Sequence, residues 1–195
     1  CSATVDRQDA EAVCELLKIP FHTANFSAEY WDRVFEHFLE TYKKGWTPNP
    51  DILCNQEIKF KAFFEHALAM GFEKIATGHY AGKVWHSEQA QLGCAADSLK
   101  DQTYFLYRIS QEALQKTLFP LAALTKKEVR NIAESLGLPN SQKKDSTGIC
   151  FIGKKDFREF LNKYIAYKPG TILCINTGQK LGTHQGLSYY TIGQR

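Results

Sequence analysis

The residues best suited to chemistry lie in one proline-stiffened segment, Thr47–Asn55, with the sequence TPNPDILCN. Its two prolines rigidify the loop, and Cys54 lies near the start of a helix expected over residues 56–70. The positive end of a helix dipole favours the thiolate, the nucleophilic form of cysteine. Asp51, three residues earlier, is placed to exchange protons with a substrate in the same loop. The plainer interpretation is a proline-capped turn with a buried thiol that acts as a small hydrophobic side chain.

A second cysteine, Cys150, lies among lysines and glycines in the segment 143–155. Positive charge lowers the pKa of a thiol, and flanking glycines favour a loop. The alternative is an incidental cysteine in a lysine-flanked surface loop. Cys54 and Cys150 are far apart in sequence, but the carboxyl edge of an α/β sheet is able to bring both loops together. Two thiols that approach each other permit persulfide or disulfide chemistry.

Two shorter segments offer contacts to a ligand. Gly78 ends a buried strand expected over residues 74–77, so a flat ligand is able to approach the backbone there, and His79 follows it. The segment Lys100–Gln102 opens a helix and is suited to touch phosphate or a base edge. A strand-end turn and a solvated helix start are the plainer interpretations. The 195 residues contain no glycine-rich phosphate loop of the P-loop or dinucleotide type.

The composition is that of a soluble globular chain, with 44% hydrophobic and 23% charged residues. The net charge of +3 is mild but permits a basic face. The 6 cysteines include no CxxC pair, which argues against a disulfide framework or a structural zinc site and favours a reducing compartment. No apolar run approaches the ~20 residues of a membrane span, so we expect no membrane partner.

Apolar periodicity predicts a short helix over 9–18, a strand over 20–26 and a stronger helix from Tyr30 to Tyr42. The helix over 56–70 and the strand over 74–77 follow. Alternating helices and strands predict a parallel α/β sheet.

The remaining segments give a second set of expectations. Residues 81–99 are polar and predicted to be irregular, and the chain from Lys100 is mainly helical. Thr125 and Glu128 form a capping box that opens a helix. That helix is expected to turn four residues inward: Val129, Ile132, Ala133 and Leu136. A last helix is expected over 154–165, and strands are expected over 171–175 and 187–192.

Five segments resemble the tRNA-specific 2-thiouridylases, in order and across essentially the whole chain. They are TPNPDILCNQEIKF (47–60), IATGHYA (75–81), KDQTYFLY (100–107), DSTGICFIGKKDFREFL (145–161) and GTHQGLSYYTIGQR (182–195). The resemblance implies an α/β fold: a partial adenine-nucleotide α-hydrolase-like (PP-loop) parallel sheet with helices over residues 1–165. The start of a β-rich central domain follows over 166–195. The family's SGGVDSS-type pyrophosphate loop does not occur here and residue 1 is not Met, so we expect an internal piece that binds ATP poorly on its own.

The same resemblance implies ATP-dependent thiolation of the wobble uridine of tRNA. ATP, accompanied by Mg²⁺, adenylates the C2 oxygen of the base, and a Cys150 persulfide supplies sulfur. Cys54 is the partner nucleophile that ends in a disulfide with Cys150, and Asp51 is the acid or base. Sulfur is expected from a relay protein or a cysteine desulfurase, in the cytoplasm or an organelle.

The resemblance also implies binding residues, which are assigned by their positions in the matching segments. The resemblance implies contacts to the target base from Asn49, Pro50 and Asp51, to ATP from Gly78, and to tRNA from His79, Lys100, Asp101 and Gln102. Three alternatives stay open: another PP-loop ATP pyrophosphatase, a non-catalytic tRNA-binding module, and a thiol–disulfide oxidoreductase, which the lack of CxxC disfavours.

Overall fold

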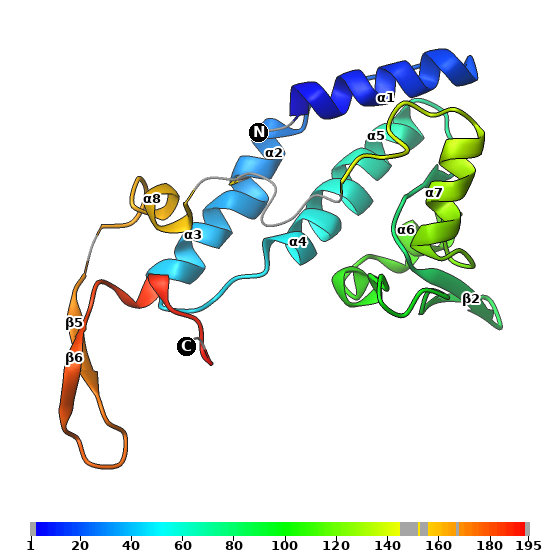
Figure 1. Ribbon diagram of the computed structural model, residues 1–195. Helices are drawn as coiled ribbons and strands as arrows, with labels where there is room; N and C mark the ends of the chain where they lie inside the picture. The colour runs from blue at the N-terminus through cyan, green and yellow to red at the C-terminus, as the bar shows by residue number, and fades with distance from the viewer. Residues whose placement is uncertain (1–2, 145–151, 153–155, 167, 194–195) are drawn as a thin grey trace.

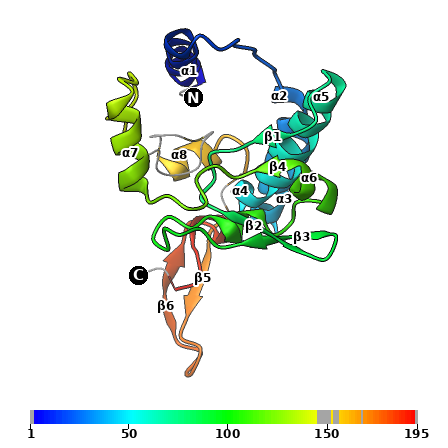
Figure 2. The ribbon, with the colours of Figure 1, turned by 90° about the vertical axis from the view of Figure 1, so that its right-hand side faces the viewer.

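Two long helical stretches lie side by side at the centre of the molecule (Figure 1). The computed structural model describes residues 3–144, 152, 156–166 and 168–193. Helix α1 (Ala3–Leu17) and the hairpin of β5 (Gly170–Leu173) and β6 (Lys180–His184) lie at opposite ends (Figures 1 and 2). The central helices therefore separate these two outer elements.

The first stretch runs without interruption through α2 (Ser27–Tyr30), the π-helical turn η1 (Trp31–Phe35) and α3 (Glu36–Lys43). Its period of 3.6 places Phe35 and Phe38 on the inner face, where both are buried. The stretch ends at Gly45, whose φ of +77° is the left-handed conformation that glycine adopts readily after a helix. The predicted helix from Tyr30 to Tyr42 is confirmed.

The second stretch runs through α4 (Pro50–Leu53), the π-helical segment η2 (Cys54–Ala62) and α5 (Phe63–Ala69). It starts at Pro50, earlier than the expected start at residue 56. The reason is local: Asn49 supplies an N-cap, and proline at the first helical position has no N–H that needs a partner.

A short parallel pair confirms the α/β class. Strand β1 (Ile75–Ala76) pairs with β4 (Thr117–Leu118), with Ile75 opposite Thr117. The helix α6 (Gln111–Lys116) leads directly into β4, as in a crossover connection between parallel strands.

The prediction that residues 81–99 are irregular is wrong. Strands β2 (Gly82–His86) and β3 (Gln89–Gly93) form an antiparallel hairpin. Its two-residue turn is made by Ser87, at a φ of +55°, and Glu88. The polar residues that obscured the strands lie on the exposed side of a two-stranded ribbon, where polarity is expected.

The helix predicted over 9–18 is confirmed by the longer α1, but the strand predicted over 20–26 is wrong. That segment is extended, and it pairs with no strand among the described residues, so it lacks the ladder that defines a strand.

The capping box is confirmed at the start of α7 (Lys126–Ser135), where the Thr125 hydroxyl accepts from the Glu128 N–H and the Glu128 carboxylate accepts from the Thr125 N–H. The inward face expected for α7 is wrong in part. Ile132 and Leu136 are 46% and 54% exposed, because no described element covers that side of the helix.

The C-terminal part contains α8 (Phe157–Leu161), the β5–β6 hairpin and a single 3₁₀ turn, η4 (Leu187–Tyr189). The predicted last helix is confirmed only from Phe157 to Leu161, since residues 162–165 are turns and a bend, and the strand after Gly170 is confirmed. The strand predicted over 187–192 is wrong: Gly186, at a φ of +152°, breaks the extended chain, and the turn that follows buries Tyr189. The domain boundary at 165/166 stays a prediction.

Two apolar clusters form the core. The first joins the inner face of α3 to α8 and η4 through Phe35, Phe38, Tyr42, Ile152, Phe160, Leu161 and Tyr189. The second joins α5 and the end of η2 to β1, α6 and η3 (Thr103–Leu106) through Phe60, Phe64, Ala67, Ile75, Ala81, Leu106 and Ala113. The second cluster lies under every candidate site segment between residues 50 and 106.

Phe38 has no exposed surface, stacks against Phe35 and makes an edge-to-face contact with Tyr42. We expect Phe38→Ala to lower the free energy of unfolding of the intact protein by about 3–5 kcal/mol, since it removes a buried ring and leaves a cavity. Urea unfolding measures this. Phe72→Ala is the matched control, because Phe72 is 53% exposed, and an equal loss in both variants would contradict the assigned core.

Candidate active site

The start of α4 holds the most reactive set of residues. The Asn49 side chain accepts a hydrogen bond from the Ile52 N–H at 3.3 Å, which fixes where the helix begins. Pro50 is buried at the first helical position, and Asp51 is exposed beside it. The cap and the proline therefore hold the carboxylate of Asp51 at a defined place on the surface.

Cys54 follows one turn later, and its thiol is half-buried. Its N–H already donates to the carbonyls of Pro50 and Asp51, so it lies past the first turn. The prediction that this thiol lies at the helix N-terminus is therefore wrong, because the dipole effect falls off within the first turn. Asp51 and Cys54 are three residues apart, a spacing that places a carboxylate and a thiol next to each other on one helix face.

A buried amide ties this helix to a distant segment. Asn55 is 3% exposed, and its Nδ2 donates to the carbonyl of Phe105 at 3.0 Å. Phe105 belongs to η3, which directly follows the segment Lys100–Gln102. The hydrogen bond therefore connects the helix that carries Cys54 to the segment predicted to contact tRNA. Sequence reasoning missed Asn55, because nothing local marks a partner 50 residues away.

Gly78 and His79 follow strand β1. A Cβ built on Gly78 has no atom within 4 Å, so the space beside this backbone is open, as a close ligand contact requires. Burial lowers the pKa of His79 from 6.5 to about 4, and the positive charge of Lys59 acts in the same direction. The ring is therefore neutral at pH 7. Its Nδ1 lies 2.6 Å from the hydroxyl of Thr77, which fixes its orientation.

The three residues of the Lys100–Gln102 segment have different surroundings. The Gln102 side chain accepts from the Tyr80 N–H at 3.0 Å, and the Gln102 N–H donates to the Tyr80 carbonyl at 2.8 Å. These two bonds join the segment to the strand-end residues at 78–80. Lys100 is exposed.

The carboxylate of Asp101 accepts hydrogen bonds from other residues of the protein. It accepts from the Ala95 N–H at 2.6 Å and from both the N–H and the hydroxyl of Thr103. Burial raises its pKa, but these hydrogen bonds outweigh burial and hold the pKa below its usual value. Asp101 is placed to hold the loop and η3 together rather than to present its charge.

Comparisons with known proteins match the whole length of the chain. A family model described as "tRNA methyl transferase HUP domain" matches residues 1–154, and one described as "tRNA methyl transferase PRC-barrel domain" matches residues 158–195. The chain belongs to the family of tRNA-specific 2-thiouridylases.

Relatives in this 2-thiouridylase family are close in sequence. The chain is 56% identical to the tRNA-specific 2-thiouridylase MnmA of Legionella pneumophila and 58% identical to that of Nitrosomonas eutropha, over all 195 residues in both cases. It is 54% identical to the protein of that name from Streptococcus agalactiae over 197 aligned positions. The chain spans about half the length of the curated relatives it matches, 52–54%.

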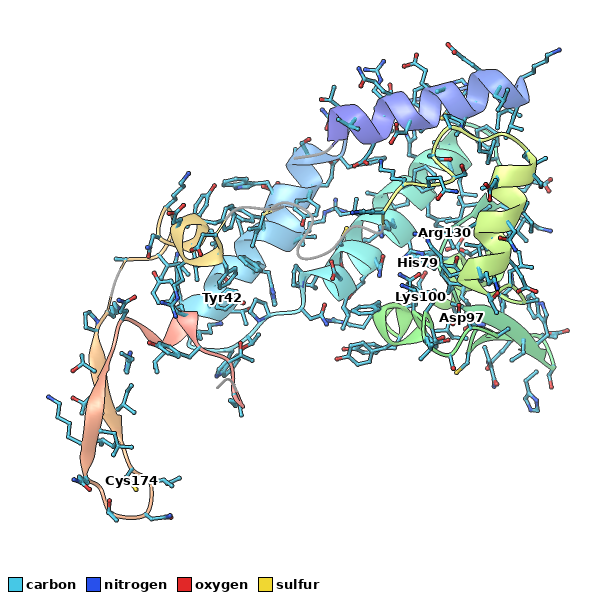
Figure 3. The ribbon with its side chains drawn as sticks, in the orientation of Figure 1. Tyr42, His79, Asp97, Lys100, Arg130 and Cys174 are labelled. Carbon is cyan, nitrogen blue, oxygen red and sulfur yellow. The ribbon has the colours of Figure 1, made fainter. Side chains whose placement is uncertain are left out.

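A shallow basic pocket extends the site beyond the predicted residues. Lys100 lines it together with residues of α7, namely Lys126, Lys127, Arg130, Asn131 and Glu134, and with Gln142 in a turn beyond that helix. Asp97 holds the two sides in place, because its carboxylate accepts from the N–H groups of Leu99 and Lys126. Figure 3 shows Lys100, Asp97 and Arg130 gathered in one region with His79. Sequence analysis missed α7 as part of this surface, although the capping box located its start.

The structure does not test the predicted meeting of the two thiols, because Cys150 lies outside the described residues. Among the described residues, Cys14, Cys94 and Cys174 are free thiols. On the N-terminal side of the second cysteine motif, Lys143 forms ion pairs with Asp6 at 2.7 Å and Asp9 at 2.5 Å on α1. These pairs fix where the chain leaves α7 and its loop.

Among the described residues, no three His, Cys, Asp or Glu side chains form a group that could hold a metal ion. The donors in this part of the chain do not fit a Mg²⁺ site, and no step below depends on one. Within the same residues, no helix is long and apolar enough to cross a membrane.

The Asn55–Phe105 hydrogen bond gives a stability prediction. We expect Asn55→Ala to lower the free energy of unfolding by about 1–3 kcal/mol, because it leaves the partly buried Phe105 carbonyl without its donor. Thermal or urea unfolding of the intact protein measures the loss. Asn140→Ala, in an exposed turn, is the control and is expected to change stability little. Equal effects would show that the buried bond contributes nothing specific.

His79 gives a pH prediction. Between pH 6.5 and 4 the unfolded chain binds a proton at this ring that the native state excludes, so stability falls as pH falls through this range. We expect His79→Gln to reduce that fall by roughly 3 kcal/mol, at 1.36 kcal/mol for each pH unit. Urea unfolding at several pH values measures it. His86→Gln, on the exposed hairpin, is expected to leave the pH dependence unchanged, and an unchanged slope in His79→Gln would contradict the burial argument.

Proposed function

We propose that the protein containing this chain transfers sulfur to C2 of the wobble uridine of tRNA at the expense of ATP. The observation that carries the proposal is the start of α4, where Asn49 and Pro50 present Asp51 and Cys54 on one helix face. The names of the relatives, which are 2-thiouridylases, support it. The family models are described as methyl transferases, but the curated relatives that match all 195 residues are named 2-thiouridylases.

Activation comes first in the proposed reaction. The C2 carbonyl of uridine is a poor electrophile, so its oxygen attacks the α-phosphate of ATP, and pyrophosphate leaves. The product is a base in which C2 carries an adenylate leaving group. The open space beside Gly78 supports a nucleotide approaching the end of β1. Mg²⁺ is expected to accompany ATP, and we assign it no ligand among the described residues.

Sulfur transfer follows. The terminal sulfur of a Cys150 persulfide attacks C2, and AMP departs with the former carbonyl oxygen. The Cys54 thiolate then attacks the Sγ of Cys150, and the bond between Sγ and the transferred sulfur breaks. The electron pair of that bond stays on the sulfur attached to C2, which becomes the thiocarbonyl. A Cys54–Cys150 disulfide results, and Asp51 supplies or accepts the proton near the base.

Regeneration needs two external partners. A thiol reductant reduces the disulfide to two thiols, and a persulfide donor, either a sulfur-relay protein or a cysteine desulfurase, reloads Cys150. We assign the reaction to a reducing compartment such as the cytoplasm, because the cycle requires its thiols to be restored. tRNA binding is assigned to His79, Lys100 and Gln102, and the hydrogen bonds of Asp101 support a positioning role for that residue.

The test uses the intact protein with ATP, tRNA and a radiolabelled sulfur donor. We expect Cys150→Ser to abolish sulfur incorporation and Asp51→Asn to slow it by about 10²–10⁴-fold, the usual contribution of a general acid or base. Without added thiol reductant, Cys54→Ser is expected to accumulate a disulfide-linked protein–tRNA adduct that dithiothreitol releases. Cys94→Ser, at an exposed position outside the motifs, is the matched control. Unchanged incorporation in Cys150→Ser would eliminate this mechanism.

A further inference from the structure

A basic pocket far from the α7 surface is the feature that the proposed function leaves unused. Its volume is about 600 Å³, within the usual range for ligand sites. It lies where the end of α3 meets the turn after α8 and the start of the C-terminal hairpin. The residues that argue for a ligand are Lys43, Lys44, Lys168 and His184.

Side-chain hydrogen bonds hold together the segments that line the pocket. The Ser188 hydroxyl donates to the carbonyl of Tyr42 at 3.0 Å, which fastens η4 to the end of α3. The hydroxyl of Tyr189 hydrogen-bonds to the side chain of Asn162, which fastens η4 to the turn after α8. Three segments that are distant in sequence are therefore held around one hollow by side-chain contacts.

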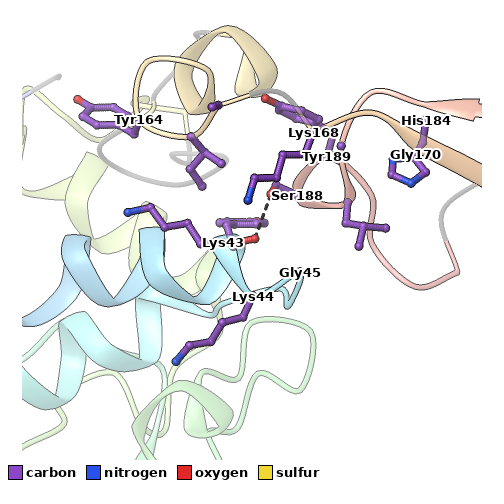
Figure 4. A pocket seen from close by; sticks show the side chains of 14 residues that line it. Lys43, Lys44, Gly45, Tyr164, Lys168, Gly170, His184, Ser188 and Tyr189 are labelled. Carbon is purple, nitrogen blue, oxygen red and sulfur yellow. Dashed lines mark hydrogen bonds between the residues drawn. The ribbon is translucent and has the colours of Figure 1, made fainter.

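The charges in the pocket are of one sign. Among the described residues, no carboxylate lines the pocket or forms an ion pair with Lys43, Lys44 or Lys168. Figure 4 shows the amino groups of Lys43 and Lys168 extending over the same hollow, with Lys44 directed to the other side of the helix end. Two ammonium groups that face one space without a counter-charge favour an anion between them.

The dipole of α3 accounts for only part of this arrangement. Cations near a helix C-terminus are stabilised, which is a sufficient reason for Lys43 and Lys44 at the end of α3. Lys168 belongs to no helix; it precedes β5 and is brought to the pocket by the fold. The dipole of α3 therefore does not explain the positive charge of Lys168.

The pocket is also close to the reacting segment along the chain. Lys44 and Asn49 are five positions apart in the sequence, so an extended chain spans at most ~18 Å between them. When the target base of a tRNA reaches Asn49–Asp51, the phosphates next to that nucleotide would therefore lie near this pocket. We propose that Lys43 and Lys168 bind a phosphate of the tRNA backbone next to the target nucleotide. This inference rests on the proposed function, since that function supplies the RNA.

Charge reversal tests the inference in the intact protein. Binding of unmodified tRNA is measured by filter binding over a series of salt concentrations for Lys43→Glu, Lys168→Glu and the neutral Lys168→Gln. We expect each reversal to raise the dissociation constant about 10-fold, the loss of one charge-assisted contact. The slope of log affinity against log salt should fall in magnitude by about 0.7–0.9 for each lost phosphate contact. Lys168→Gln is expected to reproduce the slope change with unchanged melting behaviour.

The control is Lys18→Glu, the same charge change directly after α1, at the end of the molecule opposite the hairpin (Figures 1 and 2). It is expected to keep the wild-type slope. Wild-type slopes in all three pocket variants would overturn the inference, and normal sulfur incorporation in them would leave the proposed function standing. A wild-type protein that fails to bind tRNA saturably would overturn both.

Discussion

The arrangement of the candidate site depends on one buried hydrogen bond, from the Asn55 amide to the Phe105 carbonyl. It gives a direction to the contact between the helix that carries Asp51 and Cys54 and the segment that carries Lys100 and Gln102, because apolar packing has little directional preference. A buried amide that has found its partner sets a distance and an angle as well as a contact.

The charged residues of the site fall into two groups: some form hydrogen bonds within the protein, and others are exposed on its surface. Asp101 and Asp97 accept backbone hydrogen bonds and hold loops in place. His79 is kept neutral by its surroundings, so it offers a hydrogen-bonding ring rather than a charge. The cations lie outward, on the α7 side and at the end of α3. A chain with a small net positive charge can therefore have strongly basic surfaces, because acidic groups such as Asp97 and Asp101 form hydrogen bonds with the backbone.

Sequence could predict the two long helices and the capping box of α7, because apolar periodicity and capping chemistry are local. It could not predict the β2–β3 hairpin, because polar residues in both strands hide the alternation of apolar and polar residues that marks a strand. Nor could it predict the hydrogen bond between Asn55 and Phe105, which depends on how the chain folds. The strand expected over 20–26 shows the same limit, since a strand exists only through its neighbour. In the site, residue types indicated Asp51, Cys54 and Gly78, whereas the basic contribution of α7 needed coordinates. The pairing of Cys54 with Cys150 stays a prediction.

The π-helical winding of Cys54–Ala62 has a consequence for how the thiol is aimed. Each i→i+5 turn holds more residues than an α-helical turn, so the segment contains surplus chain that an ordinary helix would not need. Removing one residue from a helix without changing its winding rotates everything before it by about 100°, one residue step at 3.6 residues per turn, whereas the wider π-helical turns absorb an extra residue and limit that rotation. Phe64 and Ala67, anchored in the core, would stay where they are. The direction in which Cys54 points is thus a matter of helical phase, and the winding of Cys54–Ala62 sets that phase relative to the anchored residues of α5.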